Sequence, residues 1–239
     1  MTPAEKPAAK GSEPRQLVLD LPHRAALGAE DFLVSSTNRQ ALELIDRWPD
    51  WPLWAVIVQG EARSGKSHLA NVWRLRSGAE RVDASRLDET AIAAFERNGT
   101  LLVEDIADGI ADERVLFHLL NLAREHRRSI LITSRIMPGE LAIALPDLRS
   151  RLTALPVATI APPDDAMLKM VLVKLFSDRQ LVVEPAVIDH LALRIERSFM
   201  AAHTIVAEID RRALATKRRV TRALAAEVLA AGGGGGDTG

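Results

Sequence analysis

The strongest chemical signal in the sequence is the segment Gly60–Ser67, which reads G-x-x-x-x-G-K-S, the pattern of a loop that binds phosphate. Gly60 and Gly65 would let the backbone turn so that successive N–H groups point at phosphate oxygens. Lys66 could then reach the β- and γ-phosphates of a nucleotide, and the hydroxyl of Ser67 could ligate Mg²⁺. A chance glycine turn is the alternative, but the flanking sequence favours a phosphate-binding loop.

Two carboxylates, Glu104 and Asp105, close an apolar run that begins at Thr100 and is typical of a buried strand. A parallel sheet with a phosphate-binding loop needs acid at the carboxyl end of a neighbouring strand, facing Mg²⁺. Glu104 would hold the ion or its waters, and Asp105 could orient a water for attack. The alternative is a helix-cap pair within residues 105–109.

Three further groups of residues could act on phosphate. Residues 133–135, Thr-Ser-Arg, end the next apolar run and could sense phosphate or position water. Arg149 and Arg151 lie near the end of the strand-rich region, where a guanidinium offered to a neighbour's γ-phosphate would stabilise transition-state charge. Arg197 begins a later helix and could reach back to the nucleotide. For each arginine, a surface ion pair is the alternative.

These polar groups need elements that bring them together, and strand-like and helical patterns alternate along residues 54–160. The loop follows an apolar run at 54–59, typical of a buried strand, and precedes helical spacing at 68–75. Further strands are expected at 81–83, 100–105, 129–134 and 155–160, and helices within 31–48 and at 86–98, 113–127 and 138–145. Such a βαβ series predicts an α/β fold, with a parallel sheet covered by helices on both faces.

The strand-like runs stop at Ala161-Pro162-Pro163, which we take as a domain boundary. Beyond it, helices are expected at 164–179, 185–194, 198–216 and 221–229. The predicted organisation is a flexible tail at 1–26, an α/β domain at 27–161, a small helical domain at 164–230 and a disordered glycine-rich tail at 231–239.

Inside the polar N-terminal tail, residues 16–21 form an apolar alternation built on Gln16, Leu17, Leu19 and Leu21. One interpretation is a short linear motif that binds a partner in an extended conformation, with alternate side chains in pockets. The other is a first edge strand of the domain. The position of the segment, ahead of the domain and followed by a proline, favours the partner-binding motif.

Composition is that of an ordinary soluble globular protein, with 239 residues of which 47% are hydrophobic and 26% charged. The formal net charge of −1 provides no field that would attract nucleic acid or a membrane surface. The absence of cysteine excludes disulfides and cysteine-ligated zinc, and it fits a reducing compartment. The sequence shows neither a signal peptide nor an apolar run long enough to span a membrane, so we expect a cytoplasmic protein.

The chain resembles an AAA+ ATPase of the replication-initiator clade. The resemblance rests on the loop, the acid pair, the polar strand end, the box Leu145–Leu152 and the arginine of the helical domain. Residues 31–34 with Asn38 resemble the nucleotide-entry segment of that clade. The resemblance covers residues 27–229. Within the clade it is strongest to the DnaA-related proteins of regulatory inactivation, in a form of α-proteobacterial type.

Two features carry that finer resemblance. Only residues 230–239 follow the helical domain, where the initiator has a further DNA-reading domain. In addition, residues 16–21 resemble the Gln-Leu-x-Leu-x-Leu peptide that binds the replicative sliding clamp.

The resemblance implies the fold of AAA+ P-loop NTPases, with residues 164–230 as a helical lid. It implies that ADP or ATP is bound, with Mg²⁺ held by Ser67 and Glu104. The nucleotide-binding residues would be Gly60, Ser64, Gly65, Lys66, Ser67, His68, Arg197, Phe32 and Leu33.

The implied partners are the sliding clamp, bound through residues 16–21, and the ATP-bound initiator DnaA, whose ATP would receive Arg151. DNA would be reached through the clamp. Hydrolysis would inactivate the initiator, so the protein would act as a negative regulator of replication initiation. No membrane is implied as a partner, and a homo-oligomer is compatible with the clade.

Two departures from the clade's pattern argue against hydrolysis by this chain itself. The acid pair is Glu-Asp where the initiator usually has Asp-Asp, and Arg135 stands where the clade commonly has an acidic residue. The alternative function is a DNA-associated initiator or helicase loader that acts on its own ATP. A P-loop kinase or metabolic NTPase fits less well, because of the helical lid and the arginine box.

Overall fold

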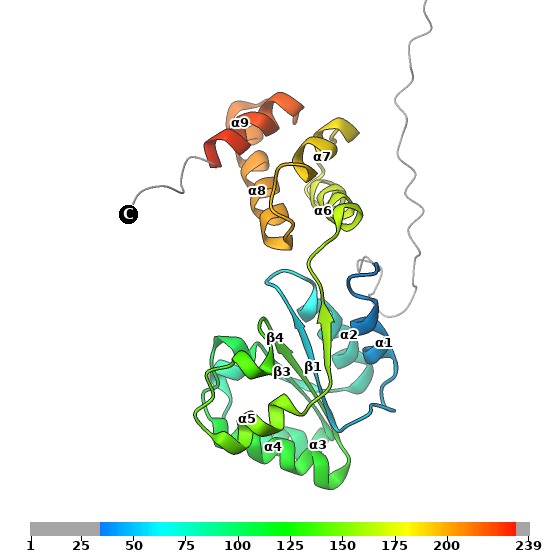
Figure 1. Cartoon of the computed structure of the whole chain (residues 1–239), viewed down its shortest axis with the longest axis vertical. Helices are drawn as coiled ribbons and strands as arrows, with labels where there is room; N and C mark the ends of the chain where they lie inside the picture. The colour runs from blue at the N-terminus through cyan, green and yellow to red at the C-terminus, as the bar shows by residue number, and fades with distance from the viewer. Residues whose placement is uncertain (1–33, 233–239) are drawn as a thin grey trace, which may run out of the picture.

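The computed structural model describes residues 34–232 of the chain, which form an α/β domain followed by a bundle of helices (Figure 1). The predicted partner motif at 16–21 and the predicted nucleotide-entry residues Phe32 and Leu33 lie outside the described residues.

A parallel sheet with the strand order β2-β3-β4-β1-β5 forms the centre of the first domain. Its strands are β1 (Ala55–Gly60), β2 (Glu80–Asp83), β3 (Thr100–Glu104), β4 (Ser129–Ser134) and β5 (Val157–Ile160). All strands run in one direction, so their carboxyl ends meet at one edge of the sheet. The predicted parallel sheet is thus confirmed, and the loop and the acid pair lie at that edge.

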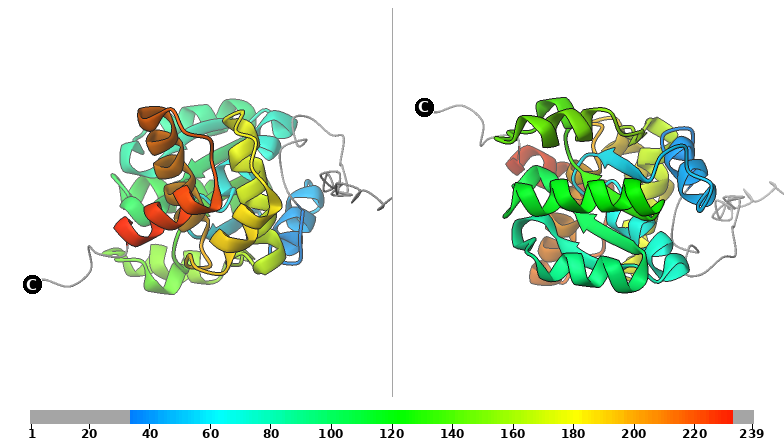
Figure 2. Two further views of the ribbon diagram at one scale, coloured as in Figure 1. Left: turned by 90° about the horizontal axis from the view of Figure 1, so that it is seen from above. Right: turned by 90° about the horizontal axis from the view of Figure 1, so that it is seen from below.

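Helices cover both faces of the sheet (Figures 1 and 2). Helices α1 (Arg39–Asp46) and α2 (Lys66–Ser77) lie on one face, and α3 (Thr90–Asn98), α4 (Glu113–His126) and α5 (Pro146–Thr153) lie on the other. Short 3₁₀ turns, η2 (Ala84–Arg86), η3 (Ile106–Asp108) and η4 (Pro138–Glu140), connect these elements.

Side chains along the central strands alternate between two hydrophobic cores, because successive residues of a strand point to opposite faces. In β1, Ile57 packs under α3, α4 and α5, while Val58 packs against α1 and α2. The second core continues into the helical bundle, where it includes Phe176 and Leu224. Continuous apolar packing therefore joins the bundle to the sheet.

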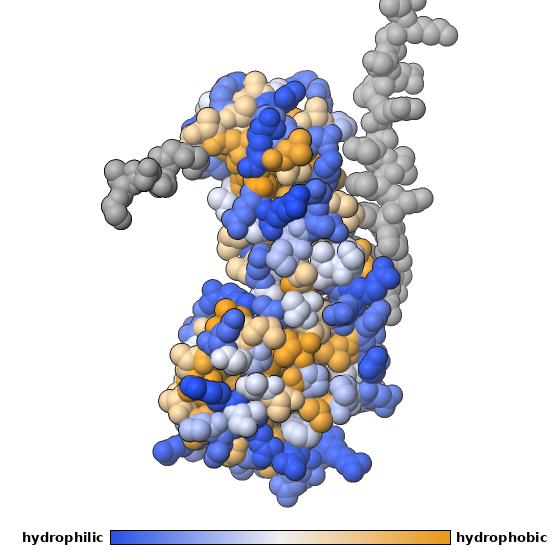
Figure 3. Space-filling view, viewed as in Figure 1, coloured by the Kyte–Doolittle hydropathy of each residue, from blue (hydrophilic) through white to orange (hydrophobic). Residues whose placement is uncertain are grey.

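The helical bundle, called the lid below, consists of α6 (Asp165–Asp178), α7 (Pro185–Ala192), α8 (Phe199–Thr216) and α9 (Arg222–Gly232). It follows β5 and lies beyond the end of the sheet, and the molecule narrows between the two domains (Figures 1 and 3). Asp164 caps α6, because its carboxylate accepts a hydrogen bond from the Met167 backbone N–H at 2.7 Å. The final helix continues to Gly232, beyond the predicted start of the C-terminal tail.

One predicted helix, at 138–145, is wrong: helical structure there is limited to η4. The carboxylate of Glu113 accepts hydrogen bonds from the N–H groups of Ala144 and Leu145, at 2.9 and 2.6 Å. These side-chain contacts replace helical backbone bonds. Pro146 keeps the preceding residue extended, and it begins α5 instead.

Between residues 34 and 232, no helix combines the length and apolar character that crossing a membrane requires.

Candidate nucleotide-binding site

The predicted phosphate-binding loop connects β1 to α2, in the strand-loop-helix arrangement that phosphate binding requires. Gly65 has a φ of 95°, a left-handed conformation that glycine adopts without strain, and it caps α2. A Cβ atom on Gly60 would lie 2.8 Å from the Ser64 hydroxyl and 3.0 Å from the Ile160 carbonyl oxygen. Glycine is therefore required at both positions, by backbone conformation at one and by close packing at the other.

Lys66 and Ser64 are the buried polar residues of the loop. The ammonium of Lys66 donates a hydrogen bond to the Glu61 carbonyl oxygen at 2.6 Å, which folds the side chain over the loop. Burial lowers the pKa of Lys66, and the nearby Asp105 carboxylate opposes that shift. The Ser64 hydroxyl has no hydrogen-bond partner among residues 34–232. Both groups can thus serve a phosphate oxygen that enters the loop.

A cavity of about 380 Å³, here called the strand-end cavity, lies between the loop and the carboxyl ends of β2, β3 and β4. Ser67 and both members of the acid pair line it. Its basic side chains are Arg63, Lys66, Arg81 and Arg135, and its carboxylates are Asp83, Glu104, Asp105 and Asp108. Cations and carboxylates are therefore equal in number around it.

Each member of the acid pair faces an arginine. Glu104 is 6% exposed, and one of its carboxylate oxygens lies 2.5 Å from the Nε of Arg81. The Asp105 carboxylate lies 3.4 Å from the Nε of Arg135, which also forms an ion pair with Asp108.

Backbone geometry fixes where these acids stand. Asp83 of β2 lies opposite Glu104 of β3, which brings Arg81 onto the same face of the sheet, diagonal to Glu104. Asp105 has a φ of 54°, and its N–H donates to the Thr133 hydroxyl at 3.0 Å. Ser134, which was predicted to face phosphate, instead donates to the Ile136 carbonyl oxygen at 2.7 Å.

These residues fit a magnesium ion only in part. The Ser67 hydroxyl is exposed to the cavity, but Glu104, the predicted second ligand, is paired with Arg81. Within the described range 34–232, no cluster of three or more His, Cys, Asp or Glu side chains could hold a metal.

A second cavity, of about 350 Å³ and here called the interdomain cavity, lies between the loop and the lid. The loop side contributes Ser64, Gly65 and His68, three of the predicted nucleotide-binding residues. The lid side contributes apolar walls suited to a nucleobase: Met167, Val171, Leu175 and Phe199. Sequence reasoning missed this wall, because its residues have the same spacing as ordinary core residues of amphipathic helices.

Arg63 lines both cavities and reaches across to the lid. Its guanidinium lies 3.3 Å from the Nδ1 of His203 in α8. Burial and the positive charge of Arg63 lower the pKa of His203, so the neutral ring can accept this hydrogen bond. This contact was not predicted, since it joins residues that are far apart in the sequence.

Arg197, the predicted nucleotide-contacting arginine of the lid, lines neither cavity of the described structure. Its guanidinium instead holds the Asp165 carboxylate, with contacts of 2.9 and 3.1 Å at the start of α6. Both side chains are largely exposed.

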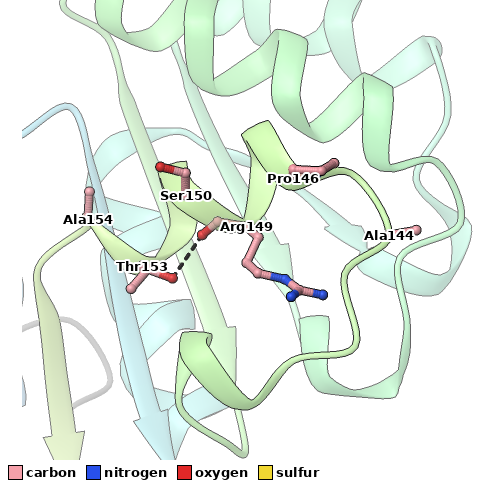
Figure 4. Close-up of a pocket in the computed structure, with 6 residues that line it drawn as sticks. All are labelled: Ala144, Pro146, Arg149, Ser150, Thr153 and Ala154. Atoms are coloured by element: carbon pink, nitrogen blue, oxygen red, sulfur yellow. Dashed lines mark hydrogen bonds between the residues drawn. The ribbon is translucent and has the colours of Figure 1, made fainter.

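Arg149 and Arg151 lie on α5, and neither lines the strand-end or the interdomain cavity. Arg151 is partly buried, with its guanidinium carbon 5.7 Å from the centre of the Phe117 ring of α4. Arg149 lines a surface cavity beside Pro146 (Figure 4). Its guanidinium donates to the Ile143 carbonyl oxygen at 2.5 Å. The two arginines therefore have different surroundings on the same helix.

Comparisons with known proteins bear on the fold. No family model matches the chain. Domain III of the replication initiation protein DnaA from Thermotoga maritima superposes with a TM-score of 0.68 at 18% identity, over 84% of this chain and 94% of that one. The RuvB Holliday junction branch migration motor of Thermotoga maritima gives 0.63 at 16% identity, over 84% and 70%.

A replication initiator DnaA bound to AMPPCP and single-stranded DNA gives 0.61 at 18% identity, over 79% of this chain and 67% of that one. Together with the five-stranded parallel sheet and the helices on both of its faces, these similarities show that the chain has the AAA+ P-loop NTPase fold.

Proposed function

We propose that the chain is a nucleotide-bound regulator of the Hda type, which stimulates ATP hydrolysis by the initiator DnaA at the sliding clamp. The structural similarity to DnaA domain III and the sequence of residues 16–21 support this assignment. The protein would lower the amount of ATP-bound initiator and so repress new rounds of replication.

The nucleotide, ADP or ATP, would lie across the two cavities of the loop. Its base would contact the apolar lid wall at Met167 and Phe199, and its phosphates would enter the loop beside Ser64 and Lys66. The N-terminus of α2 adds a favourable dipole to this arrangement.

The observation that carries the regulatory proposal is the position of Arg151. It lies on the face of the sheet covered by α3, α4 and α5, outside both cavities, so it cannot reach this chain's own nucleotide without rearrangement. A guanidinium in that position can meet a γ-phosphate only if a second protein presents one. The proposed second protein is ATP-bound DnaA.

In this mechanism Arg151 leaves the Phe117 ring and points at the partner's γ-phosphate. There its fixed positive charge would stabilise the charge that develops on the transferred phosphoryl group. Residues 16–21 would bind the clamp, and the clamp on DNA would bring this chain and DnaA together.

The alternative, an initiator or helicase loader that hydrolyses its own ATP, has less support. Hydrolysis in cis would need a carboxylate free to orient water, and both Glu104 and Asp105 face arginines.

The proposal is tested by measuring ATP turnover by purified DnaA, with this protein and clamp-loaded DNA added singly and together. We expect little stimulation from either addition alone and a large increase from both. Equal stimulation without the clamp would remove the clamp from the mechanism, and no stimulation in any combination would refute the regulatory function.

A further inference from the structure

Two arginines of the strand-end cavity stand where a metal site would need free carboxylates. We infer that the site binds nucleotide without requiring Mg²⁺, because Arg81 and Arg135 neutralise the acid pair in place of the divalent ion. The inference rests on the proposed nucleotide-binding function and specifies how that same site balances charge.

The pairing of Glu104 with Arg81 is the first support. A carboxylate with a side chain only 7% exposed is unfavourable unless it is paired, and Arg81 lies 2.5 Å from it. Arg81 is held in turn by its strand, since β2 and β3 are in register beside the acid. A metal ion at Glu104 would have to displace this guanidinium.

Arg135 provides the second support. The Gln59 amide donates to the Arg135 carbonyl oxygen at 3.0 Å, which fixes the arginine at the end of β4 beside the loop strand. Its guanidinium forms ion pairs with Asp105, at 3.4 Å between Nε and Oδ1, and with Asp108. A metal ion at Asp105 would have to displace this guanidinium.

Charge balance follows from these two pairs. In the usual arrangement, Mg²⁺ bridges carboxylate and phosphate and so cancels their repulsion. Here the repulsion is already offset by two side chains that stay protonated at all physiological pH values. A divalent cation would instead enter a cavity whose four carboxylates are already matched by four basic side chains. Mg²⁺ would therefore add little to the affinity for nucleotide, and the paired carboxylates would add little to the affinity for Mg²⁺.

The experiment measures the affinity of the full-length protein for AMPPCP, a non-hydrolysable ATP analogue, by calorimetry in Mg²⁺ and in EDTA. For the wild-type protein we expect the two dissociation constants to agree within about threefold. A loss of about tenfold or more in EDTA would overturn the inference while leaving the proposed nucleotide function intact. Absence of binding in both buffers would overturn both.

Variants assign the effect to the two arginines. In Arg81→Gln and Arg135→Gln, an unpaired carboxylate would repel phosphate and accept Mg²⁺, so the EDTA-to-Mg²⁺ ratio of dissociation constants should rise by about tenfold. Arg97→Gln is the matched control, because it removes an exposed ion pair with Glu80 outside the cavity, and its ratio should stay at the wild-type value. The ratio is taken within each protein, so a general loss of stability does not mimic it. An unchanged ratio in both cavity variants would refute the role of these arginines.

Discussion

At the level of single residues, Lys66 makes the most direct prediction. We expect Lys66→Ala to weaken ADP and ATP binding by at least about tenfold, which is the size of one lost charge-assisted hydrogen bond. The reason is that the loop loses its buried ammonium beside the phosphate path. Calorimetry measures the change, with Lys169→Ala as control, because Lys169 pairs with Asp189 in the lid and lines neither cavity. Equal affinity in wild type and Lys66→Ala would exclude the loop as the phosphate site.

The role of a single residue can be predicted from the sequence when its contacts lie within one short segment, and not when they depend on distant parts of the chain. The placement of Gly60, Gly65 and Lys66 follows from spacing within one loop, and the structure has them where the pattern puts them. Arg81 could not be found in this way, because its contact with Glu104 depends on the register of two strands. Arg197 is the reverse case. Its position in the sequence suggests a contact with nucleotide, whereas in the structure its guanidinium forms an ion pair with Asp165.

At the level of elements, the loop and β5 pack closely at Gly60, where an added Cβ atom would overlap its neighbours. We expect Gly60→Ala to lower the free energy of unfolding by about 1–3 kcal/mol, because the added methyl group would be forced against Ser64 and the Ile160 backbone. It should weaken nucleotide binding as well, since the loop must shift to relieve the overlap.

Thermal denaturation with and without ADP measures both effects. Gly139→Ala is the control, because a Cβ atom there would meet open space and the residue has no positive φ. If Gly60→Ala and the control had the same free energy of unfolding, the junction would accommodate the added methyl group, contrary to the prediction.

The elements themselves are largely readable from the sequence, and the exceptions have local causes. The central strands β1, β3 and β4 are buried apolar runs, so their positions are clear before the structure is known. The segment 138–145 carries a helical pattern, yet Glu113 satisfies its backbone and Pro146 ends it. A long-range hydrogen bond of this kind has no signature in the segment's own residues.

At the scale of the whole molecule, the proposed clamp peptide should be separable from the folded domains. We expect replacement of Gln16, Leu17 and Leu21 by alanine to abolish clamp binding while the melting temperature stays unchanged. The physical reason is that a linear motif contributes its side chains to the partner's pockets and not to the core of its own domain. A clamp pull-down and a thermal melt on the same preparation measure the two quantities. A large fall in melting temperature would favour the edge-strand interpretation.

The lid and the α/β domain are joined by one hydrophobic core, and both contribute walls to the interdomain cavity. Arg63 and His203 connect the loop to the lid across that cavity. Arg151, in contrast, belongs to the opposite face of the sheet. In the proposed mechanism, one region of the molecule holds its own nucleotide and another region is presented to a partner.

The role proposed for Arg151 is tested by ATP turnover by DnaA on clamp-loaded DNA, stimulated by wild-type protein, Arg151→Ala, Arg151→Lys or Arg149→Ala. We predict that both Arg151 variants lose stimulation by about 10³-fold or as far as the assay can resolve, because lysine keeps the charge but not the planar fork. All variants should still bind nucleotide, and Arg149→Ala should stimulate normally. Full stimulation by Arg151→Ala would refute the proposed role of Arg151 at the ATP of DnaA.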